Sequence, residues 1–251
     1  AYTAPPWEGG RYVDEHDGGW RDTSAPSPLG FAELPVPNAL SRAEIADIVT
    51  AFAQAAERAI EAGFDVIELH AAHGYLLHSF LSPLSNQRTD DYGGGFDNRV
   101  RMLLETTEAV RGVWPESKPL FVRVSATDWT EGGWDGDQTV ELARRLRARG
   151  VDLLDCSSGG AVPGVHIPTG PGYQVQFAAR VRREAALPAA AVGLITDPRQ
   201  AEAIIARGDA DAVMLARAFL RDPHWAQRAG HVLGAKVRWP SQYQRAAWSD
   251  A

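Results

Sequence analysis

The chain has 251 residues, of which 45% are hydrophobic and 23% charged, a composition that excludes an intrinsically disordered protein and provides for a sizeable core. Its formal charge is −7 at pH 7 without any run of basic residues, which excludes a surface built for nucleic acid or an anionic membrane and favours a small-molecule partner. The single cysteine, Cys156, cannot form an internal disulfide or a cysteine-ligated zinc or iron–sulfur site within this chain.

The sequence predicts neither a membrane span nor a targeting segment. No stretch approaches the roughly 18 consecutive apolar residues of a spanning helix. Residues 1–10 have neither a basic start nor an apolar run. Together with the low cysteine content, these observations favour a protein of the reducing cytoplasm.

Residues 1–40 are rich in proline, glycine and tryptophan and follow no lasting period, which predicts a long excursion or lid. At Ser41 the pattern becomes helical. Ser41 and Glu44 form a capping-box pair, and apolar residues follow at helical spacing until Gly63 ends the helix.

Short apolar runs then alternate with amphipathic stretches. The apolar runs predict five strands, at 64–69, 120–124, 151–155, 191–195 and 212–216. The amphipathic stretches predict helices near 98–112, 137–149, 174–185 and 197–207. The last of these begins with Asp197-Pro198, with proline at the first helical position. Strands that alternate with helices indicate parallel pairing and right-handed crossovers.

Five strands are too few to close an eight-stranded barrel and are compatible with an open doubly wound sheet. A Rossmann fold is disfavoured because no G-x-G-x-x-G opens a helix after any predicted strand. We therefore predict an α/β fold that is part of a (β/α)8 TIM barrel, with residues 1–251 as one domain. Its predicted parts are a lid-like region at 1–40, βα units over 41–234 and a carboxyl-terminal tail at 235–251.

The strongest chemical signal is the run His70-Ala71-Ala72-His73-Gly74-Tyr75, at the carboxyl end of a predicted strand, where α/β proteins place their sites. One alternative is a metal site that includes His78. The next carboxylates come only at Asp90 and Asp91, and no cysteine is close, so we expect no metal. The other alternative is that the histidines only cap the strand end.

Further motifs follow, namely Leu81-Ser82-Pro83-Leu84-Ser85-Asn86, Arg88-Thr89-Asp90, Tyr92-Gly93-Gly94 and Asn98-Arg99. Together with H-A-A-H-G-Y they resemble the Old Yellow Enzyme family of FMN-dependent ene-reductases, in its bacterial branch with a shared dimer active site. The resemblance implies NAD(P)H-driven reduction of the C=C bond of α,β-unsaturated carbonyl or nitro compounds. It also implies that His70 and His73 hydrogen-bond the substrate oxygen and that Tyr75 donates the proton to the α-carbon.

Elementary chemistry explains these residue types. A hydride added to an electron-poor C=C bond leaves negative charge on the conjugated oxygen, and two N–H donors stabilise that charge as an oxyanion hole does. A phenol can supply the proton. The hydride must come from a cofactor, because no protein side chain carries one.

Arg123 stands in the middle of the predicted strand 120–124, where an unpaired charge would be costly. The resemblance implies that it contacts the FMN ring; the alternative is a structural ion pair with a carboxylate such as Asp155. The last two predicted strands lead to Gly193, Ala216 and Arg217, and loops at this point in a barrel commonly bind phosphate, here that of FMN. The family usually has glycine at the position of Ala216.

Residues 239–248 resemble the carboxyl-terminal signature of the branch, in which an arginine, here Arg245, reaches across a dimer interface into the neighbouring active site. The alternative is an aromatic-rich tail that packs on its own barrel. The remaining polar residues near the third predicted strand are interpreted as strand-end structure: Asp152, Asp155, Ser157 and Ser158.

The resemblance covers nearly the whole chain but starts just past the third strand of the family, so the chain carries about the last five βα units. We therefore expect an amino-terminal barrel segment on another polypeptide, unless the chain is a product of cleavage, and an assembly that is a homodimer or larger. Open sheet edges would otherwise expose apolar surface. The alternative function is a non-catalytic partial barrel that binds a phosphorylated ligand or serves as an assembly partner.

Overall fold

The computed structural model describes residues 13–19, 22–32 and 34–248. The expectation that residues 1–10 carry no targeting segment lies outside this part of the chain. Among the residues described, no helix combines the length and the apolar character needed to cross a membrane.

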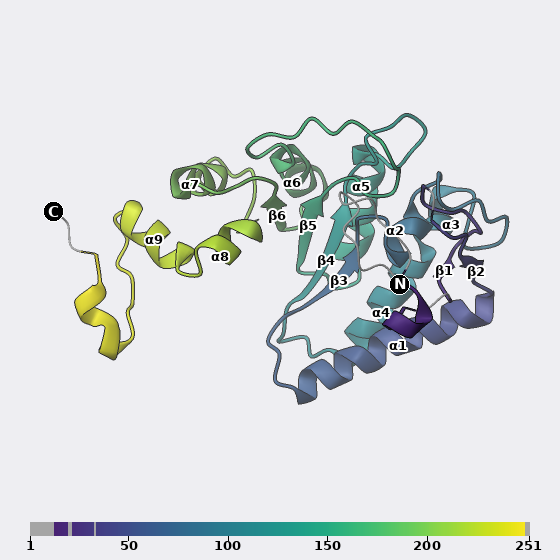
Figure 1. Ribbon diagram of the computed structural model, residues 1–251, viewed down its shortest axis with the longest axis horizontal. Helices are drawn as coiled ribbons and strands as arrows, with labels where there is room; N and C mark the ends of the chain where they lie inside the picture. Colours follow the sequence, from purple (N-terminus) through teal and green to yellow (C-terminus); the bar gives the residue numbers. More distant parts are fainter. Residues whose placement is uncertain (1–12, 20–21, 33, 249–251) are drawn as a thin grey trace.

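Five parallel strands form the main sheet and lie in the same order in space as in the chain (Figure 1). They are β3 (Ile67–Ala71), β4 (Leu120–Ser125), β5 (Leu153–Ser157), β6 (Ala189–Val192) and β7 (Ala212–Met214). At least one helix stands between each pair of neighbours. The predicted parallel alternation of strands and helices is therefore confirmed. The order has no reversal point, which a doubly wound Rossmann sheet would require.

A helix is present at each predicted place. The helices are α1 (Arg42–Glu61), α2 (Leu76–Leu81), α3 (Phe96–Arg99), α4 (Arg101–Val113), α5 (Gly136–Arg147), α6 (Val175–Arg180) with a π-helical turn (Val181–Ala185), α7 (Pro198–Ala206), α8 (Arg217–Arg221) and α9 (Trp225–Val232). Of these, α2, α8 and α9 are further short helices that the sequence pattern did not predict. Two 3-10 helices, η2 (Glu15–Asp17) and η4 (Ser241–Ala246), and a small parallel sheet of β1 (Ser24–Ala25) and β2 (Asn38–Ala39) complete the described elements.

The capping box predicted at the start of α1 is present. The Ser41 backbone N–H donates to a Glu44 carboxylate oxygen over 2.7 Å, and the Glu44 N–H donates to the Ser41 hydroxyl over 3.3 Å. These bonds satisfy two backbone groups that a helix start leaves without partners. α1 then packs along α4 (Figure 1).

Several predicted boundaries are wrong, for local reasons. The strand predicted at 64–69 starts only at Ile67, where pairing with β4 begins. The strand predicted at 191–195 ends at Val192, because Gly193 and Leu194 have φ of 122° and 51°. The strands predicted at 151–155 and 212–216 are Leu153–Ser157 and Ala212–Met214, and the helix predicted near 98–112 is divided at Val100 into α3 and α4.

One face of the sheet packs against the helices and the other carries polar side chains. The helix-facing side chains belong to the core: Leu69, Ala71, Val122, Val124, Leu154, Cys156, Ala189 and Ala191. Cys156 is free and fully buried, and burial, with a smaller effect of Asp155, raises the pKa of its thiol far above the usual value. On the opposite face, the parallel register aligns His70 with Arg123 and Arg123 with Asp155.

Candidate active site

His70, His73 and Tyr75 lie together at the carboxyl end of β3. His70 is within the strand, His73 is in the turn that follows, and Tyr75 caps the start of α2. The centroid of the His70 ring is 5.2 Å from that of His73 and 5.4 Å from that of Tyr75. The Tyr75 side chain is 65% exposed. The structure thus brings the three residues predicted from the sequence into one cluster with an accessible phenol.

The turn that carries His73 has an unusual backbone. His73 and Gly74 both lie in the left-handed region, with φ of 60° and 76°. Few residues other than glycine adopt this conformation without cost. A Cβ on Gly74 would stand 2.3 Å from the Gly160 carbonyl oxygen, so only glycine fits between the two loops.

Two serines from neighbouring strands hold His73. Its backbone N–H donates to the Ser125 hydroxyl over 2.9 Å, and its Nε2 lies 2.7 Å from the Ser157 hydroxyl. The sequence pattern indicates no role for Ser125 and only a strand-end position for Ser157. These contacts span 52 and 84 residues of chain, so no local pattern could have indicated them.

Both imidazoles are biased toward the neutral form. Burial lowers the pKa of His73 to about 4, with further lowering by the charge of Arg123 and by His70 and His78. Burial likewise lowers the pKa of His70, followed by the charges of Arg123 and His78. At neutral pH the pair can therefore offer N–H donors to an oxygen without carrying a full charge.

Arg123 forms an ion pair with Asp155, which is the alternative to a cofactor contact that the sequence allows. Its Nη1 is 3.3 Å from an Asp155 carboxylate oxygen. Burial, with a smaller effect of Glu68 and against the charge of Arg123, raises the pKa of Asp155 to about 7. Within the described residues, the Arg123 Nε and both Asp155 oxygens are buried without a hydrogen-bond partner. The Arg123 side chain as a whole is 26% exposed, so the open part of the guanidinium could meet a ligand with an acceptor edge, such as a flavin.

The residues predicted to hold a phosphate lie at the ends of neighbouring strands. Gly193 follows β6, while Ala216 and Arg217 stand at the start of α8 after β7, and both of these are exposed. A Cβ on Gly193 would come within 2.8 Å of Gln174 Nε2 and 2.9 Å of a Tyr173 ring carbon. Side chains of the chain itself thus occupy the space beside the Gly193 Cα, which leaves no room for a Cβ there.

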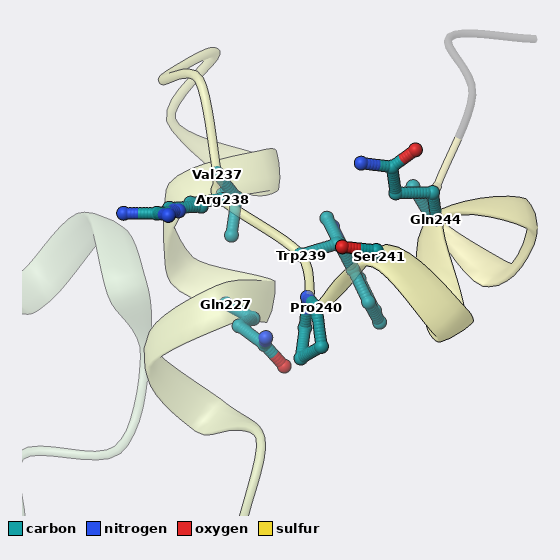
Figure 2. A pocket seen from close by; sticks show the side chains of 8 residues that line it. Gln227, Val237, Arg238, Trp239, Pro240, Ser241 and Gln244 are labelled. Atoms are coloured by element: carbon teal, nitrogen blue, oxygen red, sulfur yellow. The ribbon is translucent and has the colours of Figure 1, made fainter.

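Arg245 is not near this cluster within one chain. It is exposed on η4, which lies at one end of the molecule, well away from β3 and α2 (Figure 1). The tail packs on its own α9, where the Trp248 ring stacks on His231 at 5.4 Å between centroids. A hollow of about 720 Å³ in this region is lined by Gln227, Val237, Arg238, Trp239, Pro240, Ser241, Gln244 and Ala247. Figure 2 shows side chains that line it.

The motifs after α2 serve as anchors. The Asn86 side chain donates to the carbonyls of Phe80 and Tyr92 over 2.8 and 2.7 Å. Arg88 donates to both oxygens of Asp90 over 2.9 and 2.6 Å, which lowers the pKa of that carboxyl to about 2. The same guanidinium donates to the Pro26 carbonyl and so ties the amino-terminal excursion to this loop.

A cavity of about 830 Å³ opens beside Tyr75. It lies between the amino-terminal excursion and the start of α2, and most of its wall is apolar. Its lining includes Leu29, Phe31, Leu34, Pro35, Pro37, Tyr75, Leu76, Leu84 and Val162. The excursion predicted as a lid therefore borders the exposed phenol.

Comparison with known proteins agrees with these features. Residues 7–235 match the NADH:flavin oxidoreductase / NADH oxidase family. An NADPH dehydrogenase of Bacillus velezensis is 50% identical over 226 residues, which cover 90% of this chain and 66% of that protein. The chain thus spans about two thirds of the length of such relatives.

Two solved structures have a similar fold over most of this chain. The complex of 2-naphthoyl-CoA reductase with 2-naphthoyl-CoA superimposes with a TM-score of 0.78 at 26% identity, over 85% of this chain and 33% of that one. Morphinone reductase superimposes with a TM-score of 0.72 at 29% identity, over 92% of this chain and 64% of that one.

Proposed function

The chain belongs to the NADH:flavin oxidoreductase / NADH oxidase family, in agreement with the resemblance of its motifs to the Old Yellow Enzymes, and we propose that it carries the substrate side of an FMN-dependent ene-reductase. The complete enzyme would use NAD(P)H to reduce the C=C bond of α,β-unsaturated carbonyl or nitro compounds. The name NADPH dehydrogenase of the relatives supports the choice of reductant.

The observation that carries the proposal is the cluster of His70, His73 and Tyr75 at one strand end, with ring centroids 5.2 and 5.4 Å apart. The two neutral imidazoles would donate N–H groups to the substrate oxygen and stabilise the charge that develops there. The exposed Tyr75 hydroxyl would donate its proton to the α-carbon. The apolar cavity beside Tyr75 would receive the hydrocarbon part of the substrate.

The cofactor would lie along the polar face of the sheet. The exposed part of the Arg123 guanidinium would donate to the acceptor edge of the FMN ring, and Gly193, Ala216 and Arg217 would hold the phosphate. Bound FMN would supply the hydride for the reaction. The Asp155 carboxylate would keep the guanidinium in place through the 3.3 Å ion pair.

Further strands would complete the barrel. In the described residues, β3 and β7 are the two open edges of the sheet, and large apolar side chains near them, such as Phe64 and Val66, are exposed. We infer that a preceding barrel segment pairs with these edges, so that residues 1–40 act as the lid, 41–234 as the last five βα units and 235–251 as the tail. In a homodimer, Arg245 would reach the active site of the second copy.

A flavin assay tests the proposal. The complete protein should purify with about one FMN per chain, lose its flavin absorbance with NADPH and regain it with an enone under anaerobic conditions. The alternative is a non-catalytic partial barrel that binds a phosphorylated ligand. FMN binding without enone-dependent reoxidation would favour that alternative.

A further inference from the structure

His78 and Asp128 form a buried pair directly behind the turn that carries His73, Gly74 and Tyr75. His78 lies in α2, one turn after Tyr75, and Asp128 follows β4. Both side chains have no solvent exposure, and His78 Nε2 is 3.1 Å from an Asp128 carboxylate oxygen. Because the pair is fully buried, it does not belong to the surface that meets a substrate.

The hydrogen bonds define which nitrogen of His78 carries the proton. The Gly74 backbone N–H donates to Nδ1 over 2.8 Å, so Nδ1 is an acceptor and has no hydrogen. Nε2 therefore carries the hydrogen and donates it to Asp128. A carboxylate that orients an imidazole in this way fixes both its tautomer and its direction.

Asp128 is itself held by two more donors. The Ser82 hydroxyl donates to its second carboxylate oxygen over 2.6 Å, and the Trp134 backbone N–H donates to the same oxygen over 2.8 Å. Burial alone would raise the pKa of Asp128, but the hydrogen bonds from His78, Ser82 and Trp134 bring it below its usual value. The carboxylate is thus ionised and fully bonded within a buried network.

The network reaches Tyr75 through the backbone of Gly74. Gly74 has φ of 76° and follows His73 with φ of 60°, so the turn needs contacts that hold it. In the described part of the chain, the Tyr75 hydroxyl has no hydrogen-bond partner of its own, and the aromatic ring that the Tyr75 ring contacts is that of His70. The position of the phenol therefore depends on the turn to which it is attached.

We propose that the His78–Asp128 pair is a positioning device for the proton donor: it fixes the Gly74 N–H and thereby the direction in which Tyr75 and His73 face the substrate. The inference rests on the proposed ene-reductase function. His78 is a positioning residue and not a catalytic one, since it reaches the reacting atoms only through Gly74.

Two substitutions at His78 test its two hydrogen bonds separately, the one from Gly74 and the one to Asp128. His78→Asn keeps an acceptor oxygen at the place of Nδ1 and loses the link to Asp128, whereas His78→Gln keeps a donor toward Asp128 and loses the acceptor for Gly74. Reoxidation of the reduced enzyme by an enone should slow about 10- to 100-fold in His78→Gln and within about threefold in His78→Asn. Flavin reduction by NADPH, which needs no proton from Tyr75, should stay within about threefold in both.

Asn86→Ala is the matched structural control, because Asn86 is a buried anchor in the same region that holds Phe80 and Tyr92 and does not touch the turn. It should lower the melting temperature without changing the ratio of the two half-reactions. If His78→Gln does not fold, Asp128→Asn serves in its place. Its amide oxygen would accept from Ser82 and Trp134, so that its NH2 group faces Nε2 of His78 and moves the ring hydrogen to Nδ1. This variant loses the acceptor for Gly74, which His78→Asn keeps, and should show the same selective loss as His78→Gln. Equal slowing of both half-reactions, or an unchanged ratio in His78→Gln and Asp128→Asn, would overturn the inference.

A readout independent of the flavin accompanies the kinetics. The 15N NMR spectrum of labelled protein should show His78 with a protonated Nε2 and an unprotonated Nδ1, and a protonated Nδ1 would contradict the inference. If the wild-type enzyme shows no enone-dependent reoxidation at all, the proposed function fails. If the wild type turns over and His78→Gln retains the wild-type ratio, only the positioning role fails.

Discussion

The backbone N–H of His73 donates a hydrogen bond of 2.9 Å to the Ser125 hydroxyl, which joins the turn after β3 to the last residue of β4. The same hydroxyl donates to the Gly159 carbonyl over 2.7 Å, beyond the end of β5. One buried side chain thus connects three successive strand ends. The Ser125 hydroxyl holds the turn through the backbone of His73 and does not bond to its ring, so the ring can be removed without dismantling the turn.

That separation allows the histidines to be tested by truncation. His70→Ala and His73→Ala should each weaken the binding of a phenol that perturbs the flavin spectrum by roughly 10- to 100-fold, because each loses a hydrogen bond to a charged oxygen worth about 1.5–3 kcal/mol. Spectroscopic titration measures the dissociation constants. His224→Ala, at the start of α9, is the control and should bind as the wild type does. Unchanged titrations in both site variants would argue against oxygen binding.

Tyr75→Phe should affect one half-reaction only. Reoxidation by an enone needs a proton donor and should slow by about 10²- to 10⁴-fold, while reduction by NADPH should proceed at a near-normal rate. Stopped-flow absorbance of the flavin follows both steps. Because the side chain is 65% exposed, stability should change by less than about 0.5 kcal/mol. Equal slowing of both steps would mean that Tyr75 has a structural role.

Gly74→Ala should destabilise the protein more than Gly94→Ala. The two glycines have nearly the same φ, 76° and 78°, so alanine costs about 1–2 kcal/mol at either from backbone conformation. At Gly94 a Cβ meets nothing within 4 Å, whereas at Gly74 it stands 2.3 Å from the Gly160 carbonyl oxygen. The clash should add about 1–3 kcal/mol, measured as the difference in free energy of unfolding by denaturant. Equal losses would mean that the loop at Gly160 moves away freely.

Asp155→Asn should change how stability depends on pH. The pKa of Asp155 is raised from 3.8 to about 7 in the folded protein, so between these values the folded state holds a proton that the unfolded state has released. The stabilisation that the folded state gains by holding this proton is fully present below pH 4 and is lost as pH rises through 7. Between pH 5 and pH 8 the wild type should therefore lose about 1 kcal/mol or more of its free energy of unfolding relative to the variant, in which residue 155 does not titrate. Parallel pH curves would show that Arg123 keeps the carboxylate ionised throughout.

Because the sheet has open edges, we expect the solubility and the FMN binding of residues 1–251 to depend on further strands. Residues 1–251 expressed alone should aggregate or bind FMN in less than equimolar amount, because unpaired N–H and C=O groups of β3 and β7 are exposed with apolar side chains such as Phe64. Co-expression with an amino-terminal barrel segment should restore a yellow dimer, as measured by absorbance and sedimentation. A soluble monomer of residues 1–251 with full FMN occupancy would contradict this prediction.

The sequence predicted those features that depend on interactions between residues close together in the chain. The capping box at Ser41 and the proline start of α7 depend on residues within one turn, and both are present. The cluster of His70, His73 and Tyr75 could be predicted because six consecutive residues carry it. Strand ends were less predictable: hydrophobicity continues through Ile195, but the left-handed backbone at Gly193 and Leu194 stops β6 earlier.

Contacts between distant strands were less accessible from the sequence, because they depend on register. The ion pair of Arg123 with Asp155 was predicted only as an alternative, since it requires an alignment of β4 and β5 that no pattern within either strand encodes. The contacts of His73 with Ser125 and Ser157 depend on the same alignment. The contact of His78 with Asp128 could not be predicted for a related reason, since only the fold brings Asp128 next to His78.

The burial of Cys156 gives the protein a reporter of its own unfolding. The thiol has no exposure and faces the packed helices from the middle of the sheet, and its raised pKa suppresses the reactive thiolate. A thiol reagent can therefore modify the folded chain only after β5 separates from the helices that cover it. The rate of modification in the absence of denaturant would then measure the free energy of opening the sheet, with and without bound ligands, and no introduced label is required.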